Sequence, residues 1–435
     1  MPIVAYVLLV LGLVNPVKNN PQDLFLSFFI FGFSSYLVIS SSAFLLPFVA
    51  STLITTLIII FLELSTGSIF GTIFGLLAAY LMNWARLRKY AIFALITIFL
   101  ISSYAVSKDS RNFLSADLHF FTYNNDPGVF YKTYLQLESR VDYYEAFKNA
   151  MISRFDRKII PQDIWGWRLP TIFYIWKFLP GSTGLSIYFF YLILAGILLY
   201  AAFQIGKKYL GENLGFLSAY LLYPYLHFAA RDQMLLETEW WSVSLFIVAL
   251  YFLIAKRAFI STILFSLTVL IREVYLLPVF LIFIYFFIKE RKQSIVFLIP
   301  LVSFVIFYLY HIYRVSTYIN ALGTLLSSRT TTSGTFFVQQ TLSFASWEYL
   351  FFRLRPFIIF LLLSIVGCFL LYRTKFRKDS IIWLLSFLPF PIAFLKFGTV
   401  PYNDYWGIIY MPLVLILTPL SLLWLIDPLH ISAKK

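Results

Sequence analysis

Long apolar runs, separated by short polar turns, follow one another along most of the chain. About fourteen runs are found when ~20 residues is taken as the spanning length and shorter runs are accepted. They lie at roughly 3–14, 24–42, 44–62, 67–83, 90–106, 184–205, 214–230, 240–255, 258–272, 274–288, 294–313, 356–372, 380–396 and 406–426. Because such runs suit helices that cross a bilayer, the pattern predicts an all-α polytopic membrane protein with about 12–14 transmembrane helices.

Two long segments interrupt the alternation. The first, 107–183, is rich in Trp, Tyr and Phe, so we expect it to fold against the membrane surface and to contain an interfacial helix at about 127–150. The second, 314–355, holds a Ser/Thr/Gly stretch typical of a mobile loop, followed by an amphipathic piece at about 336–352.

These breaks predict four units. They are an N-terminal four-helix transmembrane module (1–89), a transmembrane core that includes the long loop (90–313), a mobile loop (314–355) and a set of C-terminal transmembrane helices (356–435).

Composition narrows the class of protein. Of the 435 residues, 60% are hydrophobic and 12% are charged, and the mean hydropathy is +0.82. Average soluble domains carry about 25% charged residues. The composition therefore excludes a soluble enzyme, a nucleic-acid binder and a disordered scaffold. The single cysteine, Cys368, allows no internal disulfide, and the four scattered histidines form no spaced metal motif.

The positive charges orient the predicted helices. The net charge is +14, and sixteen Lys and Arg residues fall in short loops on one side of the predicted membrane, against four on the other. Short cytoplasmic loops carry such an excess. We therefore expect a protein of the cytoplasmic membrane with both termini cytoplasmic, and with both long loops on the exterior side.

Ionisable residues gather at the exterior ends of the predicted helices. They are Asp126, Arg231, Asp232, Glu237, Glu239, Arg272, Glu273 and Asp404. Charged groups at a membrane edge are costly and are functional candidates by default. The alternative is that each is a solvated loop charge, and that Asp126, followed by Pro127, only caps a helix. We do not expect Arg272 to pair with its neighbour Glu273, because adjacent side chains diverge on a helix.

The order of these residues resembles the GT-C superfamily of integral-membrane glycosyltransferases, in particular the branch of protein O-mannosyltransferases and lipid A aminoarabinose transferases. In that branch a large exterior loop opens with an acidic motif followed by aromatics, and an Arg-x-Pro element precedes the next span. Later come an acidic residue that opens a span and a basic residue at an exterior helix end. The matching residues here are Asp126, Phe130 and Tyr131, then Asp142-Tyr143-Tyr144, Arg168-Leu169-Pro170, Glu237 or Glu239, and Arg272 with Glu273. The family commonly has Asp-Glu where this chain has Asp126-Pro127.

The resemblance implies transfer of a sugar from a polyprenyl-phosphate donor, with inversion, at the exterior membrane face. Asp126 is then the general base. The donor phosphate is bound by Arg272 first, with Arg168 and Arg231 behind it. The residues that orient the sugar or the arginines are Glu237, Glu239, Glu273 and Asp404. The acceptor is open between protein, lipid and glycan, and membrane lipid is the other partner. No metal ligands are assigned, and a divalent metal stays open as a cofactor.

Three other functions fit the same pattern. A secondary transporter has a similar number of spans, although transporter sites form at the bilayer midplane. A polysaccharide ligase or polymerase uses a polyprenyl-diphosphate donor on the same side. A non-catalytic scaffold with a degenerate site is the remaining alternative.

Overall fold

Every regular element of the residues that the structure describes is helical. The computed structural model describes residues 91–107, 111–112, 114, 126–155, 160–161, 163–181, 184–231, 234–319, 334–344, 357–398 and 404–423. The first four predicted spans, and with them the N-terminal module, lie outside this part of the chain.

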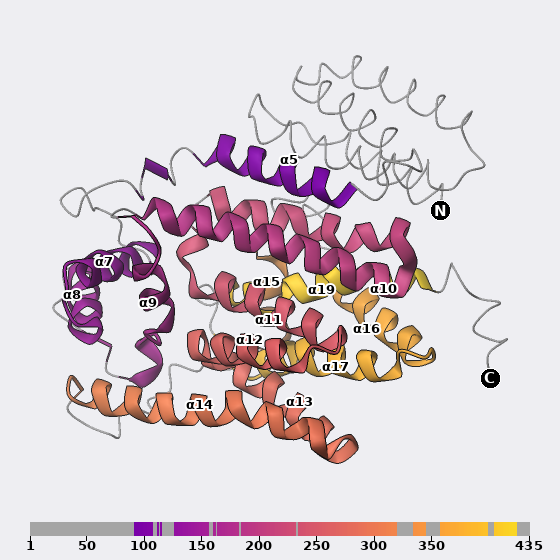
Figure 1. Cartoon of the computed structure of the whole chain (residues 1–435). Coiled ribbons are helices and arrows are strands. Elements are labelled where there is room, and N and C mark those ends of the chain that lie inside the picture. The colour runs from indigo at the N-terminus through magenta and orange to yellow at the C-terminus, as the bar shows by residue number, and fades with distance from the viewer. Residues whose placement is uncertain are drawn as a thin grey trace.

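A bundle of apolar helices forms the body of the molecule (Figure 1). Its helices are α5 (Ala91–Val106), α10 (Leu185–Arg231), α11 (Thr238–Ile254), α12 (Ala258–Ile271), α13 (Leu276–Lys289), α14 (Arg291–Ser316), α16 (Phe357–Tyr372), α17 (Arg377–Phe387), α18 (Pro389–Phe394) and α19 (Met411–Leu417). Two stretches, Leu185–Gly211 and Arg291–Ser316, are long and apolar enough to cross a membrane, and four shorter apolar helices accompany them. The described residues thus confirm an all-helical fold and are compatible with a helical membrane protein, while the predicted number of spans stays a prediction.

The long helix α10 is two helices joined at a glycine. Gly211 has φ +79° and ψ 176°, a conformation that only glycine adopts without strain. A Cβ atom on Gly215 would lie 2.2 Å from the backbone nitrogen of Lys207, so the two halves approach very closely. Tyr191 also donates a hydrogen bond of 3.2 Å to the carbonyl of Leu226, which requires the second half to run back along the first. The predicted pair of helices at 184–205 and 214–230 is therefore confirmed.

The hairpin predicted at 258–288 is also present. Helices α12 and α13 are separated by Arg272 and by the short 3-10 helix η5 (Glu273–Tyr275). The C-terminal helices are more broken than predicted. The run at 380–396 forms α17 and α18, and the run at 406–426 forms η9 (Asp404–Ile409), α19 and η10 (Thr418–Leu422). Pro389, Pro412 and Pro419 stand at the starts of three of these pieces, because proline suits the first turn of a helix and breaks its interior.

The basic turns meet at one end of the bundle. Lys208, at the turn of α10, lies 2.6 Å from Asp379 at the start of α17 and donates to the carbonyl of Ile254 at the end of α11. Lys378 pairs with Glu290, between α13 and α14, at 2.7 Å. Among the described residues, these contacts bring the turns at Lys208, Ile254, Glu290 and Asp379 to the same end of the bundle, while the side of the membrane on which this end lies stays a prediction.

Short helices of the first long loop cap the other end (Figure 1). They are α7 (Asp126–Glu138), α8 (Tyr143–Phe155), η3 (Ile164–Gly166) and α9 (Thr171–Lys177). The single helix predicted at about 127–150 is wrong, because the chain breaks between α7 and α8, where Arg140 takes a positive φ of 66°. Buried aromatic rings such as Tyr131, Tyr143 and Trp176 hold the cap together, so the part of this loop that the structure describes is folded.

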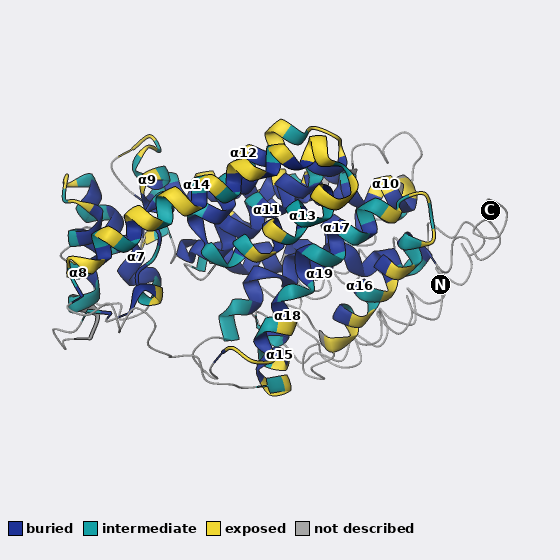
Figure 2. Cartoon of the chain, turned by 90° about the horizontal axis from the view of Figure 1, so that it is seen from below, coloured by how far each residue is buried: buried dark blue, intermediate teal, exposed yellow. Residues whose placement is uncertain are grey.

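Helix α14 differs from the other long helices in its exposure. Apolar side chains line its outer face, among them Ile299, Ile306 and Tyr313, which are 52%, 66% and 67% exposed (Figure 2). Near the C-terminal helices, α15 (Gly334–Ser343) covers part of the predicted amphipathic piece at 336–352. It packs against η9, where Phe337 meets Trp406. Most of the predicted mobile loop lies outside the described residues.

Candidate active site

An ion pair lies buried between the bundle and its cap. Arg272 follows the last residue of α12, and Glu239 lies in the first turn of α11. The Nη2 of Arg272 lies 2.8 Å from the Oε1 of Glu239, and the two residues are 2% and 0% exposed. Thr238 donates a further hydrogen bond of 3.1 Å to Oε2. Because a buried carboxylate loses its hydration, it needs such partners to stay charged.

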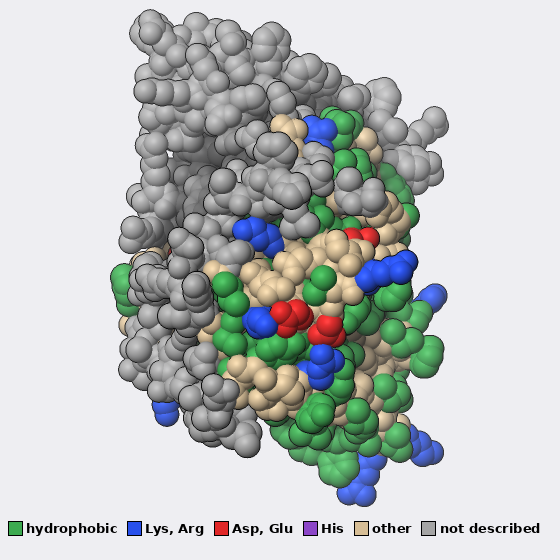
Figure 3. Space-filling view, turned by 90° about the vertical axis from the view of Figure 1, so that its left-hand side faces the viewer, with side chains coloured by type: hydrophobic (Ala, Val, Ile, Leu, Met, Phe, Trp, Pro, Cys, Tyr) green, Lys and Arg blue, Asp and Glu red, His purple; other side chains and the backbone are tan. Residues whose placement is uncertain are grey.

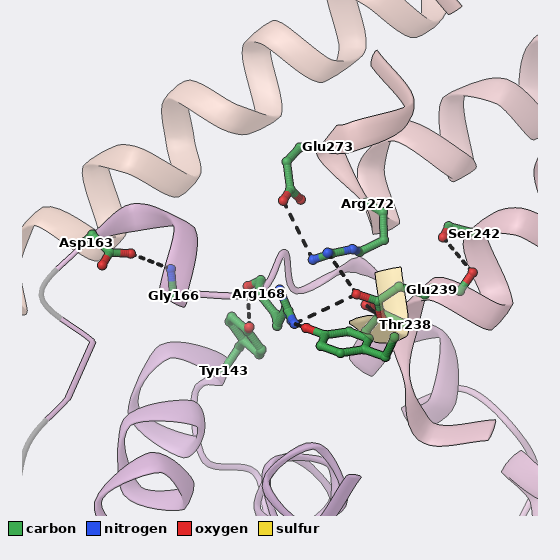
Figure 4. A network of polar contacts seen from close by, with 10 residues as sticks. Tyr143, Asp163, Gly166, Arg168, Thr238, Glu239, Ser242, Arg272 and Glu273 are labelled. Carbon is green, nitrogen blue, oxygen red and sulfur yellow. Dashed lines mark hydrogen bonds and ion pairs between the residues drawn. The ribbon is translucent and has the colours of Figure 1, made fainter. Parts of the chain in front are cut away.

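Arg272 also pairs with Glu273, which the sequence did not predict. Its Nη1 lies 3.6 Å from the Oε1 of Glu273 (Figure 4). The rule that adjacent side chains diverge applies to a continuous helix, whereas Arg272 has extended backbone angles (φ −139°, ψ 113°). The break between α12 and α13 therefore lets both residues reach the same place.

Arg168 reaches the same carboxylate from the cap. It lies between η3 and α9, and its Nη2 is 3.8 Å from the Oε1 of Glu239. The same nitrogen donates a hydrogen bond of 3.0 Å to the hydroxyl of Tyr405 in η9. The hydroxyl of Tyr143 in α8 donates to the Arg168 carbonyl (Figure 4). Residues far apart in sequence thus fix the position of Arg168.

Glu237 immediately precedes α11. It is 4% exposed, and its side chain makes no capping hydrogen bond to the helix that it starts. Burial raises the pKa of its carboxyl well above the usual value, and the negative charges of Asp126 and Glu239 raise it further. The two arginines act in the opposite direction without reversing the shift. A carboxyl in this environment favours its protonated form.

Asp126, the first residue of α7, lies near enough to act electrostatically on this cluster. Its charge acts on Glu237 and on Arg168 as well as on Tyr405. Burial disfavours the charged form of Arg168, but Tyr405, Glu239 and Asp126 together raise its pKa well above the ordinary value. Burial, with the nearby carboxylates, raises the pKa of Tyr405 to about 12 against the influence of Arg168. Since such effects weaken with distance, Asp126 belongs to the same group of charges.

Not every predicted site residue joins the cluster. Asp404 begins η9 and accepts a hydrogen bond of 3.1 Å from the backbone nitrogen of Tyr405, and burial raises the pKa of its carboxyl. It takes part in none of the ion pairs found within the described ranges. Arg231 ends α10, but its side chain and the whole of Asp232 lie outside the described part of the structure.

Tyr405 and Tyr143 contact Arg168 but were not among the predicted site residues. Tyr143 belongs to the aromatic pattern on which the family resemblance rests, but with 30 tyrosines in the chain, composition alone gives no reason to select either residue. The Tyr-Trp pair beside Asp404 was a weak signal, because it stands directly before a predicted span.

The outer surface of the cap also carries charge, in pairs. Arg314 at the end of α14 lies 2.8 Å from Asp142, and Lys148 lies 2.8 Å from Glu145 within α8. Acidic and basic side chains share this face with hydrophobic ones (Figure 3). The described residues include no group of three or more His, Cys, Asp or Glu arranged to hold a metal ion.

The site brings two arginine side chains and several carboxyl groups together between the bundle and the cap. Two guanidinium groups can bind an anion, and an aspartate beside them can accept a proton. Comparison of the chain with family models, with curated proteins and with solved structures finds no match.

Proposed function

We propose that this protein is an integral-membrane glycosyltransferase of the GT-C type, which moves a sugar from a polyprenyl-phosphate donor to an acceptor hydroxyl at the exterior face. One observation carries the proposal. Asp126, Arg168, Glu237, Glu239 and Arg272 come from distant parts of the chain and form one group of charges at the capped end of an apolar bundle, in which Glu237, Glu239 and Arg272 are buried. Burying these charges is costly, and a functional requirement accounts for it.

Asp126 is the proposed general base. It accepts the proton of the acceptor hydroxyl while that oxygen forms a bond to the anomeric carbon of the sugar. The bond between that carbon and the phosphate oxygen breaks in the same step, and the configuration inverts. A base positioned in this way typically contributes about 10²–10⁴-fold to the rate.

The arginines would bind the departing phosphate. Arg168 is the more accessible of the two, since its side chain is 13% exposed and that of Arg272 only 3%. We therefore place Arg168 as the direct phosphate contact and Arg272 behind it, holding Glu239. A forked guanidinium suits this role because it donates two parallel hydrogen bonds to phosphate oxygens.

The lipid part of the donor fits the outer surface of the bundle. The apolar face of α14 runs from the basic end to the cap, where Arg314 pairs with Asp142, the residue before α8. A polyprenyl tail that lies along the apolar face of α14 would keep its headgroup near the cap. The excess of Lys and Arg at the opposite end supports an exterior location for the cap.

Mass spectrometry of lipids that co-purify with the full-length protein tests the donor class. We expect a polyprenyl phosphate, with or without a sugar. Purified protein in liposomes should then transfer a labelled sugar from that lipid to an acceptor. A polyprenyl diphosphate would instead support the ligase or polymerase, and uptake of labelled solute into the vesicles would support the transporter.

A further inference from the structure

Glu237 is a buried carboxyl of the cluster whose position the ion pairs described above do not explain. Its Oε2 is buried and has no hydrogen-bond partner among the described residues. Both arginines approach Glu239 rather than Glu237. A buried polar atom without a partner destabilises the protein, and more so when it is charged. The side chain is therefore protonated and neutral, or its Oε2 forms a hydrogen bond with a bound ligand, or both.

The surroundings of Glu237 favour the neutral form. Two negative charges act on it, Asp126 from α7 and Glu239 from its own helix. Two positive charges act on it as well, Arg168 from the cap and Arg272 from the end of α12, but both are engaged with Glu239. The phenol of Tyr405, from η9, is a further titratable neighbour, and it is uncharged at neutral pH because burial raises its pKa to about 12. Because Glu239 already neutralises part of the charge of both arginines, they stabilise a negative charge on Glu237 less.

We propose that Glu237 works as a neutral carboxylic acid, and that its O–H donates a hydrogen bond to an oxygen of the ligand bound beside Asp126 and Arg168. The cluster then has divided roles for its acidic residues. Asp126 accepts a proton, Glu239 holds the arginines, and Glu237 donates a hydrogen bond. A ligand rich in acceptor oxygens, such as a sugar phosphate, matches this set.

The inference rests on the proposed function and adds a dependence on pH. A glutamate that loses its proton becomes a third negative charge in the cluster and repels a phosphate. Ligand binding therefore weakens as the pH rises through the raised pKa of Glu237, by up to tenfold for each further pH unit, because only the protonated fraction is competent to bind. If Glu237 were an ordinary anionic glutamate, ligand binding would not weaken in this way as the pH rises.

The protonation state of Glu237 can be measured without any ligand. Infrared difference spectra of the full-length protein, wild type minus Glu237→Gln, should show the C=O stretching band of a protonated carboxyl at pH 7. The band should shift in D₂O and disappear at high pH. A matched variant at the basic end, Glu290→Gln, removes an ion-paired carboxylate and should give no such band. Absence of the band in the first difference spectrum overturns the inference, whatever the protein's function.

Binding of a polyprenyl phosphate in nanodiscs tests the donor role. Glu237→Gln keeps an N–H donor of the same size, so it should bind the lipid about as well as wild type near neutral pH and should lose the dependence on pH. Glu237→Ala should bind about 3- to 10-fold more weakly. Equal binding by all three proteins at every pH overturns the donor role. Failure of the wild type to bind at any pH overturns the proposed donor class, and the infrared result still decides whether Glu237 holds a proton.

Discussion

Arg272 and Glu239 form an ion pair of 2.8 Å in which both side chains are buried. The pair joins the end of α12 to the start of α11, next to the cap that α7, α8 and α9 form over the bundle. The carboxylate is also 3.8 Å from Arg168, so a single acidic group holds two basic ones. This group of charges is consequently part of the fold as well as of the proposed site.

Arg272→Ala should destabilise the protein strongly. Removal of the guanidinium leaves Glu239 buried without its closest partner, which costs about 3–5 kcal/mol. Arg314→Ala is the matched control, because it breaks an ion pair of the same length, 2.8 Å, whose side chains are 27% and 44% exposed. That pair should contribute no more than about 1 kcal/mol. Thermal unfolding in detergent measures both, and equal losses would contradict a special role for burial.

Asp126→Asn should slow sugar transfer strongly while the protein stays folded. The amide keeps the shape of the side chain but cannot accept the acceptor's proton, so we expect the rate to fall by about 10²–10⁴-fold. Asp379→Asn makes the same change at the opposite end of the bundle, where Asp379 pairs with Lys208, and should leave transfer unchanged. Single-turnover transfer in liposomes is the measurement. Transfer at the wild-type rate by Asp126→Asn would remove the base assignment.

Tyr405→Phe should weaken the site without unfolding the protein. The substitution removes the acceptor of the hydrogen bond from Arg168, and a hydrogen bond to a charged group contributes about 1.5–3 kcal/mol. We expect kcat/KM for transfer to fall by about tenfold or more. Tyr310→Phe removes a similar bond, from Arg314 at 2.9 Å, on the exposed surface. If both variants retain full activity, Tyr405 does not position Arg168 for the reaction.

Glu237→Gln should change how stability depends on pH. In the wild type the raised pKa means that the folded protein keeps a proton that the unfolded chain releases. The free energy of unfolding therefore falls as the pH rises from the ordinary carboxyl pKa to the raised one, with a slope of up to about 1.4 kcal/mol per pH unit. Glutamine does not titrate, so this contribution should vanish from its profile. Parallel wild-type and variant profiles, measured from unfolding temperatures in one detergent, would contradict a protonated Glu237.

Local pattern was enough to predict most of the bundle. Apolar runs ended by charged turns predicted α11, α12, α13 and α14 to within a few residues, and the turns at Lys208 and Lys378, which were predicted to lie on one side, meet at one end of the bundle. The same reasoning failed at Arg140, where one helix became two, and at Arg272, where a residue taken as helical is extended. Both errors concern backbone breaks, which depend on how the neighbouring helices pack.

The sequence by itself determined that this protein is helical and apolar and that its charged residues collect at helix ends, because helix formation and the avoidance of buried charge act along the chain. Only the tertiary structure decided which of these charges meet. Glu239 rather than Glu237 binds the arginines, and Tyr405 approaches Arg168 from a position 237 residues later. Electrostatic interactions depend on distance in space, which a linear order of residues does not contain.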